Sequence, residues 1–155
     1  MNPVLSVLAV DDSAAIRHIL RSILQAAGHE VATAGGVASG LRILKSLQPD
    51  VILTDFNMPG LTGHDFVSRI RADRRFAAVP VFVVSSEQAV ETRMLMDAAG
   101  ANGWIAKPIS PADLLAVVEA VRRSSPVCAG RTARPVARPA LTAGVGHQRD
   151  LKGPR

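Results

Sequence analysis

Cysteine is nearly absent from this chain of 155 residues, in which Cys128 is the only one. A single cysteine forms no internal disulfide and no cluster of thiolate ligands, so a disulfide-stapled secreted scaffold and a zinc module are both excluded. Long hydrophobic runs are absent too: the longest, around 79–84, is far below the roughly 20 residues that span a bilayer. Residues 1–3 lack the basic and then apolar layout of a secretory signal. We therefore expect a cytoplasmic protein without membrane insertion.

Acidic residues are scarce only in the last part of the chain. Residues 1–123 carry 12 Lys and Arg and 12 Asp and Glu, which cancel, although the whole chain has a formal net charge of +5. Residues 124–155 carry six Lys and Arg and a single acid, Asp150, and so hold the entire excess. This tail has no aromatic side chain to stack on bases and no amphipathic face for a lipid surface. We expect no specific nucleic-acid partner.

Apolar segments rich in Val, Ile and Leu alternate with segments of helical periodicity. Strands are predicted at 4–10, 30–34, 51–54, 79–84 and 102–106. Helices are predicted at 14–27, at 37–47, around Phe66 to Ile70, at 87–99 and at 111–123. Strands this apolar, separated by helices, indicate a parallel sheet covered on both faces, which is a doubly wound α/β fold.

The periodicity stops at Ser124, where Pro, Gly, Ala and Arg follow one another without an amphipathic face. Such a composition buries too little apolar surface to offset the entropy of ordering the chain. We therefore expect one folded domain over residues 1–123 and a disordered, basic Pro/Ala/Arg-rich tail over 124–155.

Polar side chains stand directly after four of the predicted strands. These side chains are Asp11 and Asp12 after the first strand, Asp55 after the third, Ser85 at the end of the fourth and Lys107 after the fifth. Because the carboxyl ends of parallel strands meet at one edge of a sheet, we expect these side chains to converge there.

The chemistry of this set points to a phosphoryl group. Three neighbouring carboxylates repel one another unless a cation compensates, and oxygen ligands with room for water suit Mg²⁺ or Mn²⁺ better than Ca²⁺. A carboxylate can attack phosphorus to form an aspartyl phosphate, for which Asp55 is the best candidate. Lys107 would supply a positive charge and Ser85 a hydroxyl to the resulting anion.

Each of these residues also has a purely structural interpretation. An aspartate at a strand end often caps the next helix, and Ser13 can serve the same purpose after Asp11-Asp12. Ser86 is as good a cap as Ser85 for a helix that begins near Glu87, so the register at this strand end is open by one residue. The occurrence of all these residues at successive strand ends favours the phosphoryl chemistry.

The segments Asp11-Asp12, Asp55-Phe56-Asn57-Met58-Pro59-Gly60, Ser85 and Lys107-Pro108 follow the order and approximate spacing of a known family. Over residues 4–123 the chain resembles the receiver domain of two-component response regulators, in particular its CheY-like, stand-alone members. The resemblance implies a flavodoxin-like fold with strand order 2-1-3-4-5. It also implies a phosphoacceptor that receives its phosphoryl group from a sensor histidine kinase or a phosphotransfer protein.

The resemblance further implies which residues bind the metal and accept the phosphate. Asp55 would be the phosphoacceptor. Asp12, Asp55 and the backbone carbonyl of Asn57 would bind Mg²⁺ or Mn²⁺, and Asp11 would help through a water molecule.

Other residues would read the phosphate and transmit the signal. By resemblance, Ser85 and Lys107 contact the phosphate, Trp104 is the aromatic switch residue, and Asn57 and Glu87 tune the access of water, in a pattern like that of chemotaxis members. No output domain is recognisable after residue 123. We therefore expect phosphorylation-dependent binding of a downstream protein to the face formed by the fourth helix, fifth strand and fifth helix.

Three alternatives use the same residues. A phosphoaspartyl phosphatase of the haloacid dehalogenase type needs a second acid two positions after its nucleophile, where Asn57 stands. A flavin carrier of this fold needs Ser, Thr and backbone donors after the first strand, where Asp11-Asp12 stand. A degenerate receiver would act only as a docking module, although the residues here are intact. We expect a phosphoacceptor with intrinsic autodephosphorylation, not an enzyme.

Overall fold

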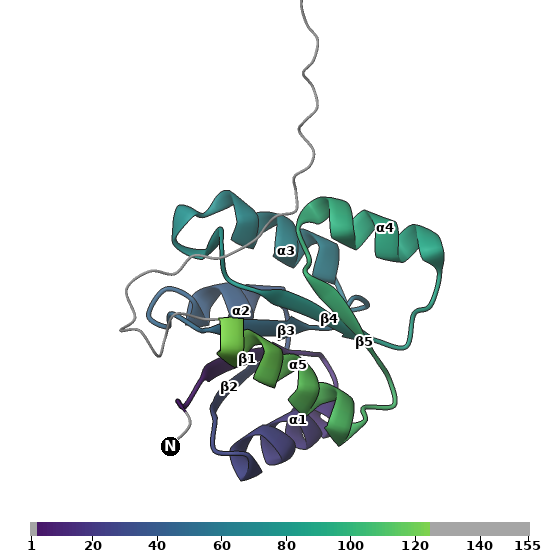
Figure 1. Ribbon diagram of the computed structural model, residues 1–155. Helices are drawn as coiled ribbons and strands as arrows, with labels where there is room; N and C mark the ends of the chain where they lie inside the picture. Colours follow the sequence, from purple (N-terminus) through teal and green to yellow (C-terminus); the bar gives the residue numbers. More distant parts are fainter. Residues whose placement is uncertain (1–2, 125–155) are drawn as a thin grey trace, which may run out of the picture.

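Five strands and five helices alternate along residues 3–124, the part of the chain that the computed structural model describes (Figure 1). The strands are β1 (Ser6–Val10), β2 (Glu30–Ala34), β3 (Val51–Thr54), β4 (Val81–Ser85) and β5 (Gly103–Ala106). The helices are α1 (Ala14–Ala26), α2 (Val37–Ile43), α3 (Gly63–Ala72), α4 (Val90–Ala99) and α5 (Pro111–Ser124), with a short 3₁₀ helix, η1 (Arg74–Phe76). The tail predicted over 124–155 lies outside the described residues, apart from Ser124 at the end of α5.

All neighbouring strands in the sheet are parallel, in the order β2-β1-β3-β4-β5. The expected flavodoxin-like fold and strand order are thus confirmed. The chain passes to one side of β1 to form β2 and to the other side to form β3. In open α/β sheets this reversal creates a crevice beyond the carboxyl ends of the two central strands, here β1 and β3.

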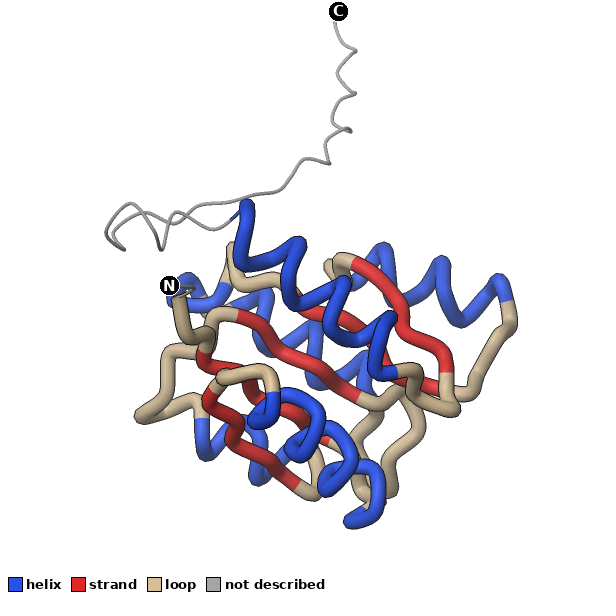
Figure 2. The backbone as a smooth tube through the Cα atoms, turned by 60° about the horizontal axis from the view of Figure 1, so that its bottom comes forward, coloured by secondary structure: helices blue, strands red, loops and turns tan. Residues whose placement is uncertain are grey.

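Helices cover both faces of the sheet (Figures 1 and 2). Alternate residues of each strand point to opposite faces, so Leu8 of β1 lies in the core beneath α2, α3 and α4, while its neighbour Val7 lies in the core beneath α1 and α5. Phe66 of α3 anchors the first core and Leu114 of α5 the second, and both are fully buried. Burial on both faces explains why the strands are so uniformly apolar.

Several predicted boundaries are wrong by two to four residues, and the first of them is the start of β1, which lies at Ser6 and not at residue 4. The helix predicted over 37–47 ends at Ile43, because the amides of Lys45 and Ser46 bond to carbonyls three residues back, which tightens the last turn. The fourth strand begins at Val81 and not at residue 79, since Pro80 has no amide proton for a strand ladder.

No helix within residues 3–124 is long and apolar enough to cross a membrane.

The helix predicted from Glu87 begins three residues later, at Val90. The amide of Glu87 donates to the Ser85 hydroxyl at 3.1 Å, which makes a turn at the end of β4 instead of a helical turn. Ala89 occupies the N-cap position and makes no side-chain cap. Neither Ser85 nor Ser86 therefore caps α4.

Candidate functional site

Asp11 extends β1 by one residue and turns inward. Its amide donates to the carbonyl of Ala34 at 3.1 Å, and its side chain is only 1% exposed. One carboxylate oxygen, Oδ1, accepts the amide of Ser13 at 2.9 Å, while Ser13 itself caps α1 by accepting the amide of Ile16. The capping of α1 thus belongs to Ser13, and the second oxygen of Asp11 is left to face the site.

Asp55 holds the equivalent position after β3. Its amide donates to the carbonyl of Val10 at 2.9 Å, which places Asp55 beside the end of β1, and its side chain is 7% exposed. Oδ1 of Asp55 accepts the amide of Phe56 at 2.8 Å. This bond orients the carboxylate and leaves Oδ2 as its free edge.

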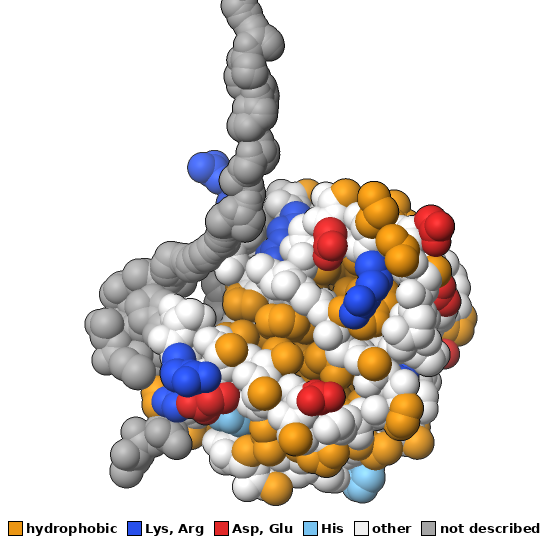
Figure 3. Space-filling view, turned by 45° about the vertical axis from the view of Figure 1, so that its right-hand side comes forward, with side chains coloured by type: hydrophobic (Ala, Val, Ile, Leu, Met, Phe, Trp, Pro, Cys, Tyr) orange, Lys and Arg blue, Asp and Glu red, His pale blue; other side chains and the backbone are white. Residues whose placement is uncertain are grey.

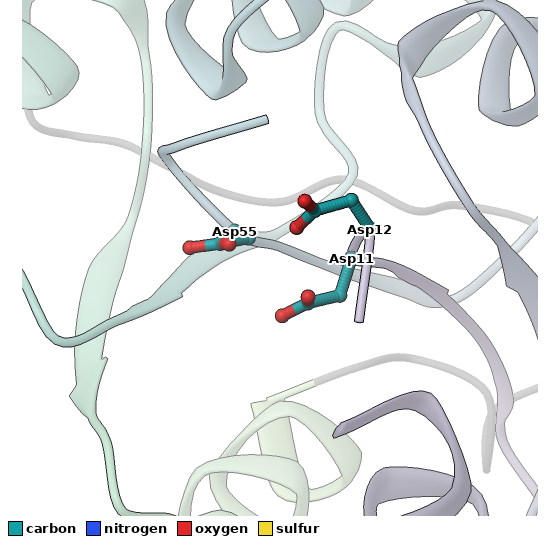
Figure 4. Close-up of side chains that lie close together, drawn as sticks. All are labelled: Asp11, Asp12 and Asp55. Atoms are coloured by element: carbon teal, nitrogen blue, oxygen red, sulfur yellow. The ribbon is translucent and has the colours of Figure 1, made fainter. Parts of the chain in front are cut away.

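Three carboxylates meet at the ends of β1 and β3 (Figure 4). Asp11, Asp12 and Asp55 each present an oxygen that lies within 4.8 Å of the other two. Asp12 is exposed whereas the other two are buried, so the cluster opens to solvent on the side of Asp12. Burial and the negative charge of Asp11 raise the pKa of Asp55, against the opposing effect of Lys107.

Lys107 brings an ammonium group into this cluster. Its Nζ lies 2.9 Å from Oδ2 of Asp11 and 3.4 Å from Oδ2 of Asp55. Burial alone would lower the pKa of Lys107, but its hydrogen bond to Asp11 and the charges of both aspartates outweigh burial and raise it. The lysine is therefore held charged between the two buried carboxylates.

Ser85 is the residue of the Ser85-Ser86 pair that faces inward. Its side chain is fully buried and Ser86 is exposed, which settles the register. The carbonyl of Ser85 accepts the amide of Lys107 at 3.1 Å, so pairing of β4 with β5 ties these two residues together. Glu87 is half-buried and its carboxylate accepts the hydroxyl of Thr92 on α4 at 3.3 Å.

Asn57 and Trp104 lie outside the carboxylate cluster. The side chain of Asn57 is exposed in the loop after β3. Trp104 pairs with Val83 in the sheet, is half-buried, and packs on the core beneath α3 and α4. Its indole nitrogen is buried and meets no hydrogen-bond acceptor from residues 3–124, and the guanidinium carbon of Arg93 lies 5.2 Å from the centre of its ring system.

A family model described as the response regulator receiver domain matches residues 7–119. The chain belongs to this family. The receiver is 32% identical over 119 residues to the chemotaxis protein CheY1 of Helicobacter pylori, a match that covers 76% of this chain and 96% of CheY1. The predicted resemblance to CheY-like receivers is confirmed.

Solved structures support the same assignment. The chemotaxis response regulator CheY4 of Vibrio cholerae matches the receiver with a TM-score of 0.73 and 37% identity, over 77% of this chain and 99% of that one. The receiver domain of sensor histidine kinase PA1611 from Pseudomonas aeruginosa PAO1 matches in fold, with a TM-score of 0.73 and 24% identity over 79% of this chain and all of that one. That domain holds a magnesium ion in its active site cleft.

Membership in the family has consequences for the alternatives. Receiver domains are signalling phosphoacceptors that bind Mg²⁺ at an acidic pocket and interact with histidine kinases or phosphotransfer proteins, and they are not generally classed as enzymes. This favours a phosphoacceptor over a haloacid dehalogenase-type phosphatase or a flavin carrier.

Two residues that position the site were missed in the sequence. A Cβ atom at Gly63, the first residue of α3, would lie 2.3 Å from the carbonyl oxygen of Asp55, so only glycine lets α3 begin so close to the receiver's central aspartate. Arg17 donates from Nη1 to the carbonyl of Asp11 at 2.7 Å and thereby holds the loop after β1. A glycine at the start of a predicted helix was a usable signal for Gly63, but no local pattern marks Arg17.

Proposed function

We propose that the receiver works as a phosphorylation-dependent switch and that Asp55 accepts the phosphoryl group from a sensor histidine kinase or phosphotransfer protein. The observation that carries this proposal is the position of Asp55, whose Oδ2 stands at the free edge of its carboxylate, 3.4 Å from Lys107 Nζ. An anionic oxygen beside a fixed cation is suited to attack on phosphorus, because the cation offsets the charge that builds up on the phosphoryl oxygens.

We further propose that the acidic cluster holds Mg²⁺ or Mn²⁺, with ligands from Asp12, Asp55 and the carbonyl of Asn57 and with Asp11 acting through water. Three ionised carboxylates and one ammonium leave two negative charges, which one divalent ion neutralises. Oxygen ligands at about 2.1 Å in an octahedron are separated by about 3–4 Å. Oxygens within 4.8 Å of one another need only a small closure to reach that spacing. The bound ion would supply positive charge to the phosphoryl oxygens.

Ser85 and Lys107 are proposed to read the phosphate. Because Oγ of Ser85 accepts the amide of Glu87, its hydroxyl hydrogen can be donated to a phosphoryl oxygen. Lys107 can exchange its bond to Asp11 for a bond to the more highly charged phosphoryl group. Trp104 lies in β5, three residues before Lys107, so a movement of Ser85 and Lys107 would change its surroundings. We propose Trp104 as the switch residue. Asn57 and Glu87 would tune the access of water, and hence autodephosphorylation.

The output of the switch is proposed to be binding of a downstream protein to the face of α4, β5 and α5. Three hydrophobic side chains of α4 are exposed: Val90 (66%), Met94 (64%) and Leu95 (46%). Figure 3 shows hydrophobic side chains gathered on this side of the molecule. Exposed apolar patches of this kind are typical of protein interaction sites. Because several relatives are chemotaxis proteins, we include a role in chemotaxis in this proposal. A cytoplasmic location stays a prediction.

Acetyl phosphate with Mg²⁺ tests the phosphoacceptor. Intact-mass measurement should find one phosphoryl group on the wild-type chain and none on Asp55→Asn, while the exposed control Asp97→Asn should react like the wild type. Phosphorylation of Asp55→Asn at the wild-type level would refute the assignment. Beryllofluoride, a phosphoryl mimic, should change Trp104 fluorescence only when Mg²⁺ is present and Asp55 is intact. A wild type that takes up no phosphoryl group would instead support the docking-module alternative.

A further inference from the structure

A second charged site lies between α1 and β2. It is a cavity of about 240 Å³ lined by Ala14, Arg17, His18, Arg21 and Thr33. None of the carboxylates of the acidic cluster lines it. In Figure 1, α1 and β2 run side by side at the lower edge of the molecule, where β2 is the edge strand of the sheet.

Both arginines of this cavity are held in place by neutral acceptors. Nη1 of Arg17 donates to the carbonyl of Asp11 at 2.7 Å, and Nη2 of Arg21 donates to the hydroxyl oxygen of Thr33 at 3.1 Å. Gly35 leaves room for the first guanidinium, since a Cβ atom there would come within 3.3 Å of it. These bonds restrict half-buried Arg17 and, to a smaller extent, exposed Arg21 before any ligand arrives, which reduces the entropy cost of binding one.

No carboxylate in the described part of the chain neutralises these two charges. Within residues 3–124, neither Arg17 nor Arg21 has a carboxylate oxygen within 4.0 Å, in contrast to Arg75, which pairs with Asp73. The nearest acid in the sequence, Asp12, directs its carboxylate into the acidic cluster. Glu30, the acid of β2, lies at the opposite end of that strand from Thr33. Among the residues that the structure describes, the cavity therefore holds two positive charges without a counter-charge.

We propose that this cavity binds the dianionic head of a phosphate monoester. Two guanidinium groups match the double charge of the ester, whereas a single carboxylate would leave one arginine unpaired. His18 and the hydroxyl hydrogen of Thr33 supply further donors to a tetrahedral group with three terminal oxygens. A cavity of about 240 Å³ is smaller than the roughly 300–1,000 Å³ usual for whole ligands, so the organic part of the ester extends into solvent.

NMR titration of the full chain with glycerol 3-phosphate tests the proposal, in metal-free buffer at constant ionic strength. Amide signals of Ala14, Arg17 and Thr33 should shift in a saturable manner, while the signal of Lys107 stays in place. Arg21→Gln should weaken binding at least tenfold, and the control Arg42→Gln, an exposed arginine on α2, should change it less than twofold.

Three results would overturn the proposal. The first is equal weakening by Arg21→Gln and Arg42→Gln, which would indicate non-specific charge attraction. The second is a shift centred on Lys107, which would place the ester in the acidic pocket. The third is equally tight binding of malonate, which would mean that the cavity recognises any dianion. Because Arg17→Gln also removes the bond to Asp11, Arg21→Gln carries the test, and Thr33→Val provides a second variant that should weaken binding without changing the charge.

Discussion

The guanidinium of Arg93 lies over the indole of Trp104, with 5.2 Å between its central carbon and the centre of the ring system. This contact joins α4 to β5, two of the three elements that form the proposed output face. The indole nitrogen is buried and has no acceptor within the described part of the chain, so this position of the ring leaves one polar group unsatisfied. An attractive contact and an unsatisfied donor on one side chain suit a residue with two accessible positions.

Replacement of Arg93 by alanine should loosen Trp104. An exposed cation–π contact is worth about 0.5–1 kcal/mol, so we expect Arg93→Ala to lower the free energy of unfolding by about that amount. The size of the Trp104 fluorescence change on addition of beryllofluoride should also differ from that of the wild type, because the ring no longer has to break its contact with Arg93. Urea unfolding and fluorescence measure the two effects. Arg69→Ala, which removes an exposed arginine of α3, is the control, and an identical response in both variants would mean that the contact between Arg93 and Trp104 does not hold the ring.

Gly63→Ala should disturb the site without altering its chemistry. The added Cβ would lie 2.3 Å from the carbonyl oxygen of Asp55 and 2.9 Å from Cα of Phe56, and neither backbone atom can move aside like a flexible side chain. We expect a loss of about 1–3 kcal/mol in the free energy of unfolding, as for other overpacked positions, together with slower phosphorylation. Urea denaturation measures the loss.

The matched control for this change is Gly36→Ala, because a Cβ atom at Gly36 meets nothing within 4 Å and its backbone is extended. Because glycine is preferred to alanine at an N-cap position, this change should cost about 0.5–1 kcal/mol and should leave phosphorylation unchanged. Equal effects of the two substitutions would mean that the approach of α3 to Asp55 is not tight.

Asp55 should make stability depend on pH in metal-free buffer. Because burial and Asp11 raise the pKa of folded Asp55 above its usual 3.8, the folded state binds the Asp55 proton more tightly than the unfolded state. The contribution of Asp55 to stability is therefore full below pH 3.8 and is lost as pH rises through the folded pKa. As the pH rises from 3.8 through the folded pKa of Asp55, the wild type loses this contribution and Asp55→Asn does not. The free energy of unfolding of the variant should therefore increase relative to that of the wild type. Urea unfolding at a series of pH values in EDTA measures it, and a difference independent of pH would contradict the raised pKa.

Lys107→Ala should separate phosphorylation from signalling. Without the ammonium group, Oδ2 of Asp11 and Oδ2 of Asp55 lose their cation, and the pKa of Asp55 should rise further. We expect acetyl phosphate still to phosphorylate Asp55 when Mg²⁺ is present, but the beryllofluoride response of Trp104 to be lost. Lys45→Ala, which changes an exposed lysine after α2, should behave like the wild type. A full Trp104 response in Lys107→Ala would remove Lys107 from the switch.

Most of the fold could be predicted from the sequence, because helix and strand periodicity is a property of near neighbours in the chain. Strands β2 and β3 have the predicted bounds, whereas Pro80 delays the start of β4 and a turn closed by the Ser85 hydroxyl delays the start of α4. The Glu87 amide could bond in a turn or in a helix, and only the burial of the Ser85 hydroxyl in the folded chain decides for the turn. The strand order came from the family resemblance, since periodicity does not reveal which strands are neighbours.

The candidate site was visible in the sequence for a related reason: the carboxyl ends of parallel strands share one edge, so Asp11, Asp55 and Lys107 had to converge there. The sequence by itself thus determined the alternating elements, their apolar faces and the chemistry gathered at that edge. Only the tertiary structure decided that Lys107 sits closer to Asp11 than to Asp55, across 96 positions of sequence, and that Gly63 abuts the Asp55 carbonyl. Contacts of this kind depend on how all the helices pack on the sheet, and no local pattern encodes that packing.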